Sequence, residues 1–165
     1  MRVVMYSNDD FFRVIGHISV FFATLDLFTS EVIVRLMPGD PTTTPPFPEN
    51  STLGQKLALL EKLKSTEVTN SDVLLDLQEG LPRAQAAAKE RNRYMHDQWV
   101  FDSGLIAQGR IRRVRLVFGS PLKANIQELT IQDLQAFLSE VGELQKVFAQ
   151  ALKILNPSGV ALQGA

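Results

Sequence analysis

The sequence has no cysteine and only two histidines, His17 and His96, among its 165 residues. The missing cysteines exclude a disulfide-stapled scaffold, a Cys-ligated zinc site, an iron–sulfur centre and a thiol nucleophile. Two histidines are too few for a His-rich metal cage, so we expect neither a metal nor a cofactor. The sequence also has no Walker loop, no dinucleotide-binding glycine fingerprint, no His-Glu-x-x-His motif and no nucleophile elbow.

A long uncharged run is also missing. The longest one near the start covers only residues 14–25, whereas a helix needs roughly 20 apolar residues to span a bilayer. Asp9 and Asp10 precede this run and no small-residue cleavage pattern follows it, which argues against a signal peptide. We therefore expect a cytoplasmic protein that does not contact a membrane.

The remaining composition is that of an ordinary globular protein. Hydrophobic residues make up 45% of the chain, and 17 Lys and Arg face 18 Asp and Glu. Residues 1–156 are predicted to form a single helical-bundle domain. The small and polar residues 157–165 are expected to form a flexible tail.

Helical periodicity dominates the domain. Apolar residues recur every three or four positions over residues 9–36, as on one face of a long helix. Five of the eight prolines lie in residues 37–50, which predicts an extended loop there. Further helices are predicted over 52–64, 70–79, 82–99 and 130–155, with a break or kink at Gly80-Leu81-Pro82. Thr130 and Asp133 have the spacing of a capping box for the last helix. The sequence thus predicts an all-α fold, a four- to five-helix up-and-down bundle.

A segment before the last helix has strand character. Apolar side chains alternate with others in residues 111–118, which is the period of two typical of a strand. Residues 100–104 are a second candidate strand, joined to the first through Gln108-Gly109. We predict a small β-hairpin over about residues 100–118, inserted before the last long helix.

Polar residues gather where the helix over 82–99 should be apolar. At about 100° per residue, its buried stripe occupies a sector of roughly 60°. That stripe consists of Leu81, Ala84, Ala88, Met95 and Trp99. Asn92 lies at its edge, His96 lies one turn beyond Asn92, and Arg91 flanks the other side. Burying such groups unpaired costs several kcal/mol, so we expect partners or a ligand to satisfy them.

The segment Arg91-Asn92-Arg93-Tyr94-Met95-His96 resembles the signature of the HEPN superfamily (nucleotide-binding domains of higher eukaryotes and prokaryotes). That signature is an Arg, a polar residue that is commonly Asn, and a His four to six residues after the Arg, on a helix of a bundle. Many HEPN proteins are metal-independent ribonucleases that act as dimers, with the two motifs meeting at the interface. The resemblance implies Arg91, Asn92 and His96 as catalytic residues, RNA or a nucleotide as ligand, and a homodimer. It also suggests a toxin or host-defence system with an antitoxin-like protein partner.

These residue types suit RNA cleavage without a metal. Histidine titrates near neutral pH and can move a proton at the ribose 2′-hydroxyl or at the leaving oxygen. A guanidinium donates two parallel hydrogen bonds to a phosphate and opposes the charge that develops on it. Asn92, one turn from His96, can hold the imidazole or the scissile phosphate. A two-fold dimer would supply a second His96, so that one imidazole acts as base and the other as acid.

The region around the motif is basic. Residues 83–123 contain nine Lys and Arg but three Asp and Glu, although the whole chain has a net charge of −1. A face of this kind suits a polyanion. The predicted RNA contacts are Arg93, Arg110, Arg112, Arg113 and Arg115. As an alternative, the strand arginines only protect a sheet edge from aggregation.

Two other functions are consistent with the same residues. One is a non-catalytic HEPN-like bundle that binds a nucleotide, RNA or a protein through its basic face. The other is a purely structural bundle, in which Arg91 pairs with Asp72 or Asp76 and His96 bonds a neighbouring helix. The surroundings of Arg91 and His96, either sealed within the subunit or facing a groove, distinguish these readings.

Overall fold

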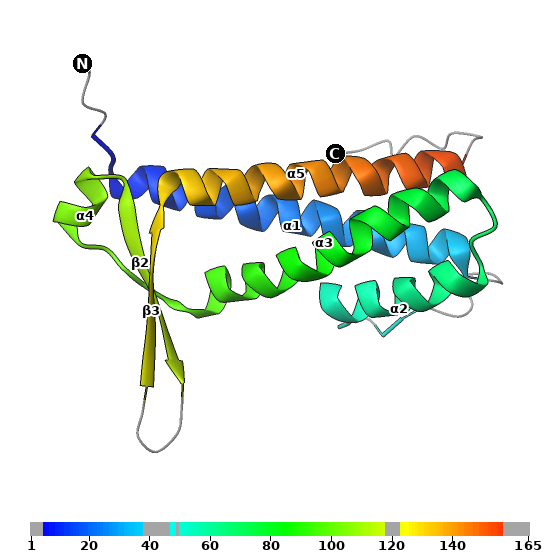
Figure 1. Cartoon of the computed structure of the whole chain (residues 1–165), viewed down its shortest axis with the longest axis horizontal. Coiled ribbons are helices and arrows are strands. Elements are labelled where there is room, and N and C mark those ends of the chain that lie inside the picture. The colour runs from blue at the N-terminus through cyan, green and yellow to red at the C-terminus, as the bar shows by residue number, and fades with distance from the viewer. Residues whose placement is uncertain (1–4, 38–46, 49, 118–122, 157–165) are drawn as a thin grey trace.

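The computed structural model describes residues 5–37, 47–48, 50–117 and 123–156 (Figure 1). In that part of the chain the elements are α1 (Asn8–Leu36), α2 (Leu53–Thr66), α3 (Ser71–His96), β1 (Gln98–Val100), α4 (Ser103–Ala107), β2 (Arg110–Val117), β3 (Lys123–Thr130) and α5 (Ile131–Leu155). The predicted loop over 37–50 falls mostly outside the described residues, and the predicted tail over 157–165 falls outside them entirely.

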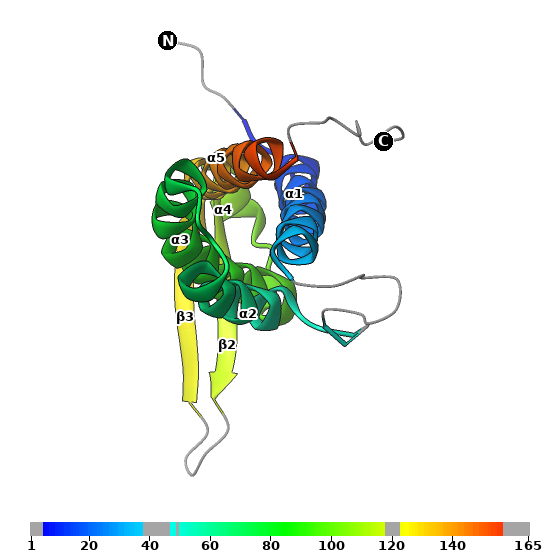
Figure 2. The same ribbon diagram turned by 90° about the vertical axis from the view of Figure 1, so that its right-hand side faces the viewer.

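Four of the helices close into a bundle around one core. α1 packs against α5 and α2, and α3 packs against the same two helices, so the four form a ring when viewed end-on (Figure 2). The buried stripe of α1 includes Phe11, Val14, Ile18, Phe22 and Leu25. The facing stripe of α5 includes Leu134, Val141, Leu144 and Phe148. The predicted helical bundle, with a small sheet before its last long helix, is confirmed.

The start of α5 is the capping box that the sequence predicted. The Thr130 hydroxyl accepts a hydrogen bond from the Asp133 amide at 3.1 Å, and the Asp133 carboxylate accepts one from the Thr130 amide at 2.7 Å. The hydrogen bonds that the Thr130 amide and hydroxyl donate to the Asp133 carboxylate hold the pKa of Asp133 below its ordinary value of 3.8. The box satisfies two amides that a helix end would otherwise leave without partners, so α5 begins directly where β3 ends.

α1 is more apolar than its place in the bundle requires. By length and composition alone it could cross a membrane, because it has 29 residues and its most apolar stretch has a mean hydropathy of 1.5, charged residues included. Only 28% of that stretch is buried in the bundle. The same helix provides part of the core through residues such as Ile18 and Leu25, both fully buried. The predicted cytoplasmic location therefore stays a prediction.

α3 is one continuous helix, so the prediction of a new helix starting at Pro82 is wrong. Gly80 explains part of this, because a Cβ there would lie 2.9 Å from Cγ1 of Val147 on α5. The glycine thus permits close packing of α3 on α5 rather than ending a helix. Pro82 and Gln78 both lie on the exposed side of α3, where the carbonyl that Pro82 cannot bond is open to solvent. Tertiary packing outweighs the local cost of proline.

The sheet has three antiparallel strands in the order β1-β2-β3, where the sequence predicted two. β1 pairs with β2 from Gln98↔Val114 to Val100↔Arg112, and β2 pairs with β3 along its whole length. Of residues 100–104, which were expected to form a strand, Val100 belongs to β1 and residues 103–104 belong to α4. β3 was not predicted from the sequence. Residues 123–127 are all exposed, so they show no alternation of buried and exposed side chains. β2 is the central strand over residues 112–114, so the alternative that its arginines protect a sheet edge is wrong for Arg112 and Arg113.

Gln108-Gly109 is a turn, as predicted, but it joins α4 to β2. Gly109 has a φ of 73°, in the left-handed region that glycine adopts without strain. A Cβ at this position would lie 2.7 Å from the ring of Tyr6, and the Gly109 carbonyl accepts a hydrogen bond from the Ile131 amide at 2.9 Å. The turn thereby fixes the sheet to the starts of α1 and α5.

Candidate functional site

α2 is shorter than its neighbours, which leaves a recess between α1 and α3. Both of those helices continue past the start of α2 (Figure 1). A cavity of about 780 Å³ opens there. It is lined by Ser19, Phe22, Ala23, Asp26, Ser51, Thr52, Leu53, Gly54, Ala58, Gln85, Ala88, Lys89, Arg91, Asn92 and His96.

The three predicted catalytic residues lie together on the wall of this cavity. Asn92 and His96 are exposed and Arg91 is half-buried. Gln85, Lys89, Asn92 and His96 follow one another at spacings of four, three and four residues, which places these four side chains along one face of α3. Arg91 reaches the cavity from a different side of the helix. Arg91 and His96 are therefore not sealed inside the subunit.

The predicted buried stripe of this helix is partly correct. Leu81, Ala84 and Ala88 are buried, whereas Met95 is half-buried and Trp99 lies beyond the helix, on β1. Tyr94 is the buried aromatic residue that the wheel missed. It stacks on Trp99 with 5.7 Å between ring centroids, and the Trp99 indole N–H donates to the Tyr94 carbonyl at 2.9 Å.

Arg91 has no carboxylate partner among the described residues. Its nearest polar contact is a long one, 3.5 Å from Nη1 to Oδ1 of Asn92. The alternative pairing with Asp72 or Asp76 is wrong, because the 15 residues from Asp76 to Arg91 span about 22 Å of a continuous helix at 1.5 Å per residue. The Arg91 guanidinium can therefore bond a ligand without first breaking an ion pair.

The electrostatics of the cavity favour an anion. Lys89 and Arg91 are on its wall, and no ion pair joins either of them to a carboxylate in the described part of the chain. Asp26 is the acidic residue of the lining, and the buried Lys56 ammonium neutralises it at 2.7 Å. The N-terminus of α2 also opens here, closed by a capping box of Thr52 and Gln55 and with no acidic residue in its first turn. Its dipole adds positive potential.

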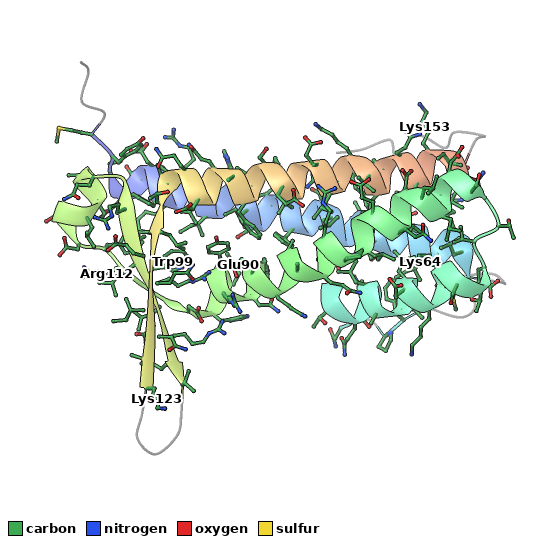
Figure 3. The ribbon with its side chains drawn as sticks, in the orientation of Figure 1. Lys64, Glu90, Trp99, Arg112, Lys123 and Lys153 are labelled. Atoms are coloured by element: carbon green, nitrogen blue, oxygen red, sulfur yellow. The ribbon has the colours of Figure 1, made fainter. Side chains whose placement is uncertain are left out.

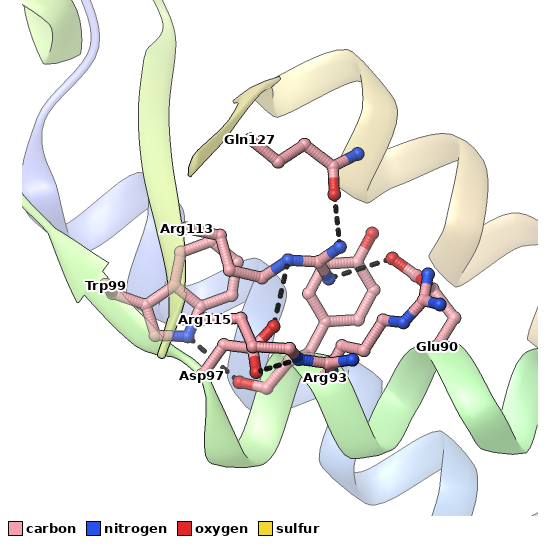
Figure 4. A network of polar contacts seen from close by, with 8 residues as sticks. Glu90, Arg93, Asp97, Trp99, Arg113, Arg115 and Gln127 are labelled. Carbon is pink, nitrogen blue, oxygen red and sulfur yellow. Dashed lines mark hydrogen bonds and ion pairs between the residues drawn. The ribbon is translucent and has the colours of Figure 1, made fainter. Parts of the chain in front are cut away.

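The arginines of the sheet are arranged differently. Arg113 is only 3% exposed and lies between α3 and β3 (Figure 4). Its Nη1 is 2.8 Å from Oε1 of Glu90, its Nε is 3.6 Å from Oδ2 of Asp97, and its Nη2 donates to Oε1 of Gln127 at 2.5 Å. Its guanidinium also lies 4.8 Å from the centre of the Tyr94 ring. Burial raises the pKa of Tyr94 to about 12. We call these five residues the Arg113 cluster.

The other predicted RNA-contact arginines are also paired with carboxylates. Arg115 binds Asp97 at 3.0 Å and Arg93 binds Glu90 at 2.9 Å, while Arg110 and Arg112 share Glu128. All four remain partly exposed, in contrast to Arg113. Glu90 lies on α3, and Arg112 lies on the side of the sheet away from α3 (Figure 3). The predicted basic face is thus largely neutralised, whereas Lys89 and Arg91 at the cavity form no ion pair among the described residues.

The sequence contained a signal for part of this pairing. Glu90 and Asp97 immediately flank the motif, and both carboxylates accept from arginines of the sheet. Their partners are 18 and 23 residues away along the chain, so the pairing itself needed the fold. Among the described residues, no three His, Asp or Glu side chains are grouped to hold a metal ion.

Comparison with known proteins adds no assignment to these observations. No protein-family model, no curated protein and no solved structure matches this chain.

Proposed function

We propose that this chain is a metal-independent endoribonuclease of the HEPN type that works as a homodimer. One observation carries the proposal: Arg91, Asn92 and His96 share the wall of an open, positively charged cavity, and the Arg91 guanidinium has no carboxylate partner among the described residues. A bundle that used these residues only for its own stability would be expected to pair them internally, as it pairs Arg113.

In the proposed reaction the imidazole of His96 removes the proton from a ribose 2′-hydroxyl. The resulting oxygen attacks the adjacent phosphorus, and the bond from phosphorus to the 5′-oxygen breaks as that oxygen takes up a proton from the protonated imidazole of the second His96 in the dimer. The products are a 2′,3′-cyclic phosphate and a 5′-hydroxyl end. Arg91 stabilises the negative charge on the phosphorane oxygens, and Asn92 positions the imidazole or the phosphate.

An apolar stripe on α1 that stays largely exposed supports the dimer, although its first residue, Phe12, also packs against Phe101 with 4.8 Å between ring centroids. Phe12, Val20 and Leu27 are 54%, 62% and 48% exposed, and with Gly16 and Ala23 they occupy a sector of about 80° at 100° per residue. Exposed apolar patches of this kind mark interaction surfaces. Ala23 belongs both to this stripe and to the cavity lining, so a second copy docked on the stripe would border the cavity. In a two-fold dimer the two cavities would then approach one another.

We expect Val20→Asp to raise the dissociation constant of the dimer by at least about 100-fold, or about 2.7 kcal/mol. Two symmetry-related carboxylates would have to be buried without partners. Sedimentation equilibrium measures the constant. Leu75→Asp is the matched control, because Leu75 is 63% exposed on α3 and outside the stripe. A monomeric wild-type protein, or equal weakening by both substitutions, contradicts the proposed interface.

The proposed activity is tested by incubating the protein with single-stranded RNA in EDTA. We expect cleavage with cyclic-phosphate ends, and about 100-fold slower cleavage by Arg91→Ala, because the variant loses the donor to the developing charge. Arg35→Ala, an exposed arginine in the last turn of α1, should cleave like the wild type.

Three results would contradict the proposal in different ways. If the RNA stays intact after incubation with folded dimer, the proposed nuclease activity is excluded. If EDTA abolishes cleavage, the proposed metal-independent mechanism is excluded. Salt-sensitive RNA binding without turnover would favour the non-catalytic binding module instead.

A further inference from the structure

β3 is an edge strand whose outer side no described element covers. It pairs with β2 along its whole length, and β1 lies on the far side of β2. Apart from this pairing, no main-chain group of residues 123–129 is hydrogen-bonded to another part of the described chain. β2 and β3 also project from the bundle past α3 (Figure 1, Figure 2). The outer side of β3 therefore presents main-chain donors and acceptors that an added strand can pair with.

The face of the sheet that points away from α3 is apolar along this edge. Arg113 and its cross-strand partner Gln127 face α3. Because side chains alternate along a strand, Leu116 and Ile126 lie on the opposite face, where they are 38% and 64% exposed. An antiparallel sheet with one solvated face normally has polar side chains there. Exposed apolar side chains in such a place indicate a contact surface for a partner.

The face that points toward α3 is positively charged along the same edge. Arg93, Arg113 and Arg115 are ion-paired with only two carboxylates, so positive charge is in excess. These arginines line a second cavity, of about 220 Å³, which β3 borders. One water occupies roughly 30 Å³ in the liquid, so the cavity has room for a carboxylate side chain. Lys123 is exposed on this face and forms no ion pair among the described residues.

A second copy of β3 would not complement this edge. In an antiparallel pair about a two-fold axis, residues on the same face lie opposite one another. The α3 side of β3 consists of Lys123, Asn125, Gln127 and Leu129, with no carboxylate. Self-pairing would leave Lys123 without an opposite charge, and a lysine at a sheet edge discourages such pairing. A partner that complements the edge has to bring the negative charge itself.

We propose that the outer edge of β3 is a docking site for an extended segment of a partner protein, which adds a strand to the sheet. The side chains of this segment alternate, with apolar residues beside Ile126 and acidic residues beside Lys123 and the second cavity. Main-chain hydrogen bonds to β3 supply affinity, and the two faces of the sheet supply selectivity. The docking edge is independent of the proposed ribonuclease function, because Arg91, Asn92 and His96 lie outside it.

The probe is an eight-residue peptide, the length of β3, in which Glu alternates with Val. It has capped ends and a fluorescent label, and its binding to the whole protein is followed by fluorescence anisotropy. We expect saturable binding, and at least about 10-fold weaker binding of the same peptide with Lys in place of Glu, because like charges would meet at the edge.

Lys123→Glu tests the charge at the edge. We expect it to reduce the preference for the acidic peptide to less than about 3-fold, because the cation that favours this peptide becomes an anion. Lys62→Glu is the matched control. It changes the net charge equally, at an exposed position of α2 far from the sheet in the fold, and should leave the preference unchanged.

Ile126→Asp tests the apolar face. We expect at least about 10-fold weaker binding of the acidic peptide, because an apolar contact is lost and a like charge is added. Val100→Asp is the matched control, since Val100 is 42% exposed on the same face but lies on β1, at the opposite edge of the sheet. It should bind the peptide like the wild type. Both positions are exposed, and circular dichroism should show the wild-type fold in both variants.

Two N-methylated versions of the acidic peptide test the addition of a strand. The amides of alternate residues in a strand point to the same side, so methylating every second amide blocks either the side that faces β3 or the other side. We expect one version to bind at least about 10-fold more weakly, because its hydrogen bonds to β3 are lost. The other version should bind like the parent peptide.

Several results would overturn the docking edge. These are no saturable binding of the acidic peptide, equal binding of the acidic and basic peptides, a preference that survives Lys123→Glu, equal effects of Ile126→Asp and Val100→Asp, and equal binding of the two N-methylated versions. If the protein alone self-associates through Ile126 and the acidic peptide does not compete, the occupant is a second copy and the proposal is wrong. Because no RNA is present in these measurements, their failure leaves the proposed nuclease untouched.

Discussion

Arg113→Ala is expected to lower the free energy of unfolding by about 3 kcal/mol, at the lower end of the cost of breaking a buried ion pair. The substitution removes a guanidinium that is only 3% exposed and bonded to Glu90, Asp97 and Gln127. The two carboxylates would stay in a largely desolvated place. Arg93 and Arg115 still neutralise part of their charge, which is why the upper end of the range is not expected.

Urea unfolding followed by circular dichroism measures this loss. The control is Arg112→Ala on the adjacent position of β2, where the side chain is 46% exposed and its partner Glu128 is shared with Arg110. An exposed pair of this type contributes about 0–1 kcal/mol. Equal, small losses in both variants would show that the Arg113 cluster does not anchor the sheet to α3.

The helices were predictable because each one carries its own signal. The three- and four-residue spacing of Phe11, Val14 and Ile18 buries one face of α1 whatever that face meets. The Thr130–Asp133 box also acts within four residues. Local patterns of this kind need no knowledge of the rest of the chain, so the positions and order of the helical segments followed from the sequence.

The continuity of α3 and the third strand depend on distant contacts. Gly80 reads locally as a helix breaker, but its role is close packing on Val147, which is 67 residues away in the chain. β3 is held by hydrogen bonds to β2 and has little buried apolar surface of its own. A pattern within one segment cannot reveal an element that its neighbour stabilises.

Part of the candidate site could be predicted from the sequence and part of it could not. Arg91, Asn92 and His96 are neighbours on one helix, so the sequence was sufficient to group them. The cavity they line requires α2 to begin at Leu53, well short of the end of α3 that carries the motif. Gln85 was not predicted, because its place in the lining depends on the shape of that cavity. The neutralisation of the sheet arginines likewise requires the register that brings Arg113 opposite Gln127 and near Glu90.

Because the ion-paired residues of the sheet and the residues of the motif are different, a substitution at the motif should affect cleavage and stability differently. The Arg113 cluster stabilises the junction of sheet and bundle, and it lies directly next to His96 through Asp97. His96 itself is exposed and forms no ion pair among the described residues. Removing it should therefore change chemistry and leave stability nearly unaltered.

His96→Ala is expected to reduce RNA cleavage by about 10²–10⁴-fold, the usual contribution of a positioned general acid or base, with a change in unfolding free energy within about 0.5 kcal/mol. Single-turnover cleavage in EDTA gives the rate, and urea unfolding gives the stability. His17→Ala is the matched control, because His17 is exposed on α1 and outside the cavity. His96 has no role in the proposed reaction if His96→Ala cleaves at the wild-type rate, or if cleavage falls equally in both variants. No other histidine is among the residues that line the cavity.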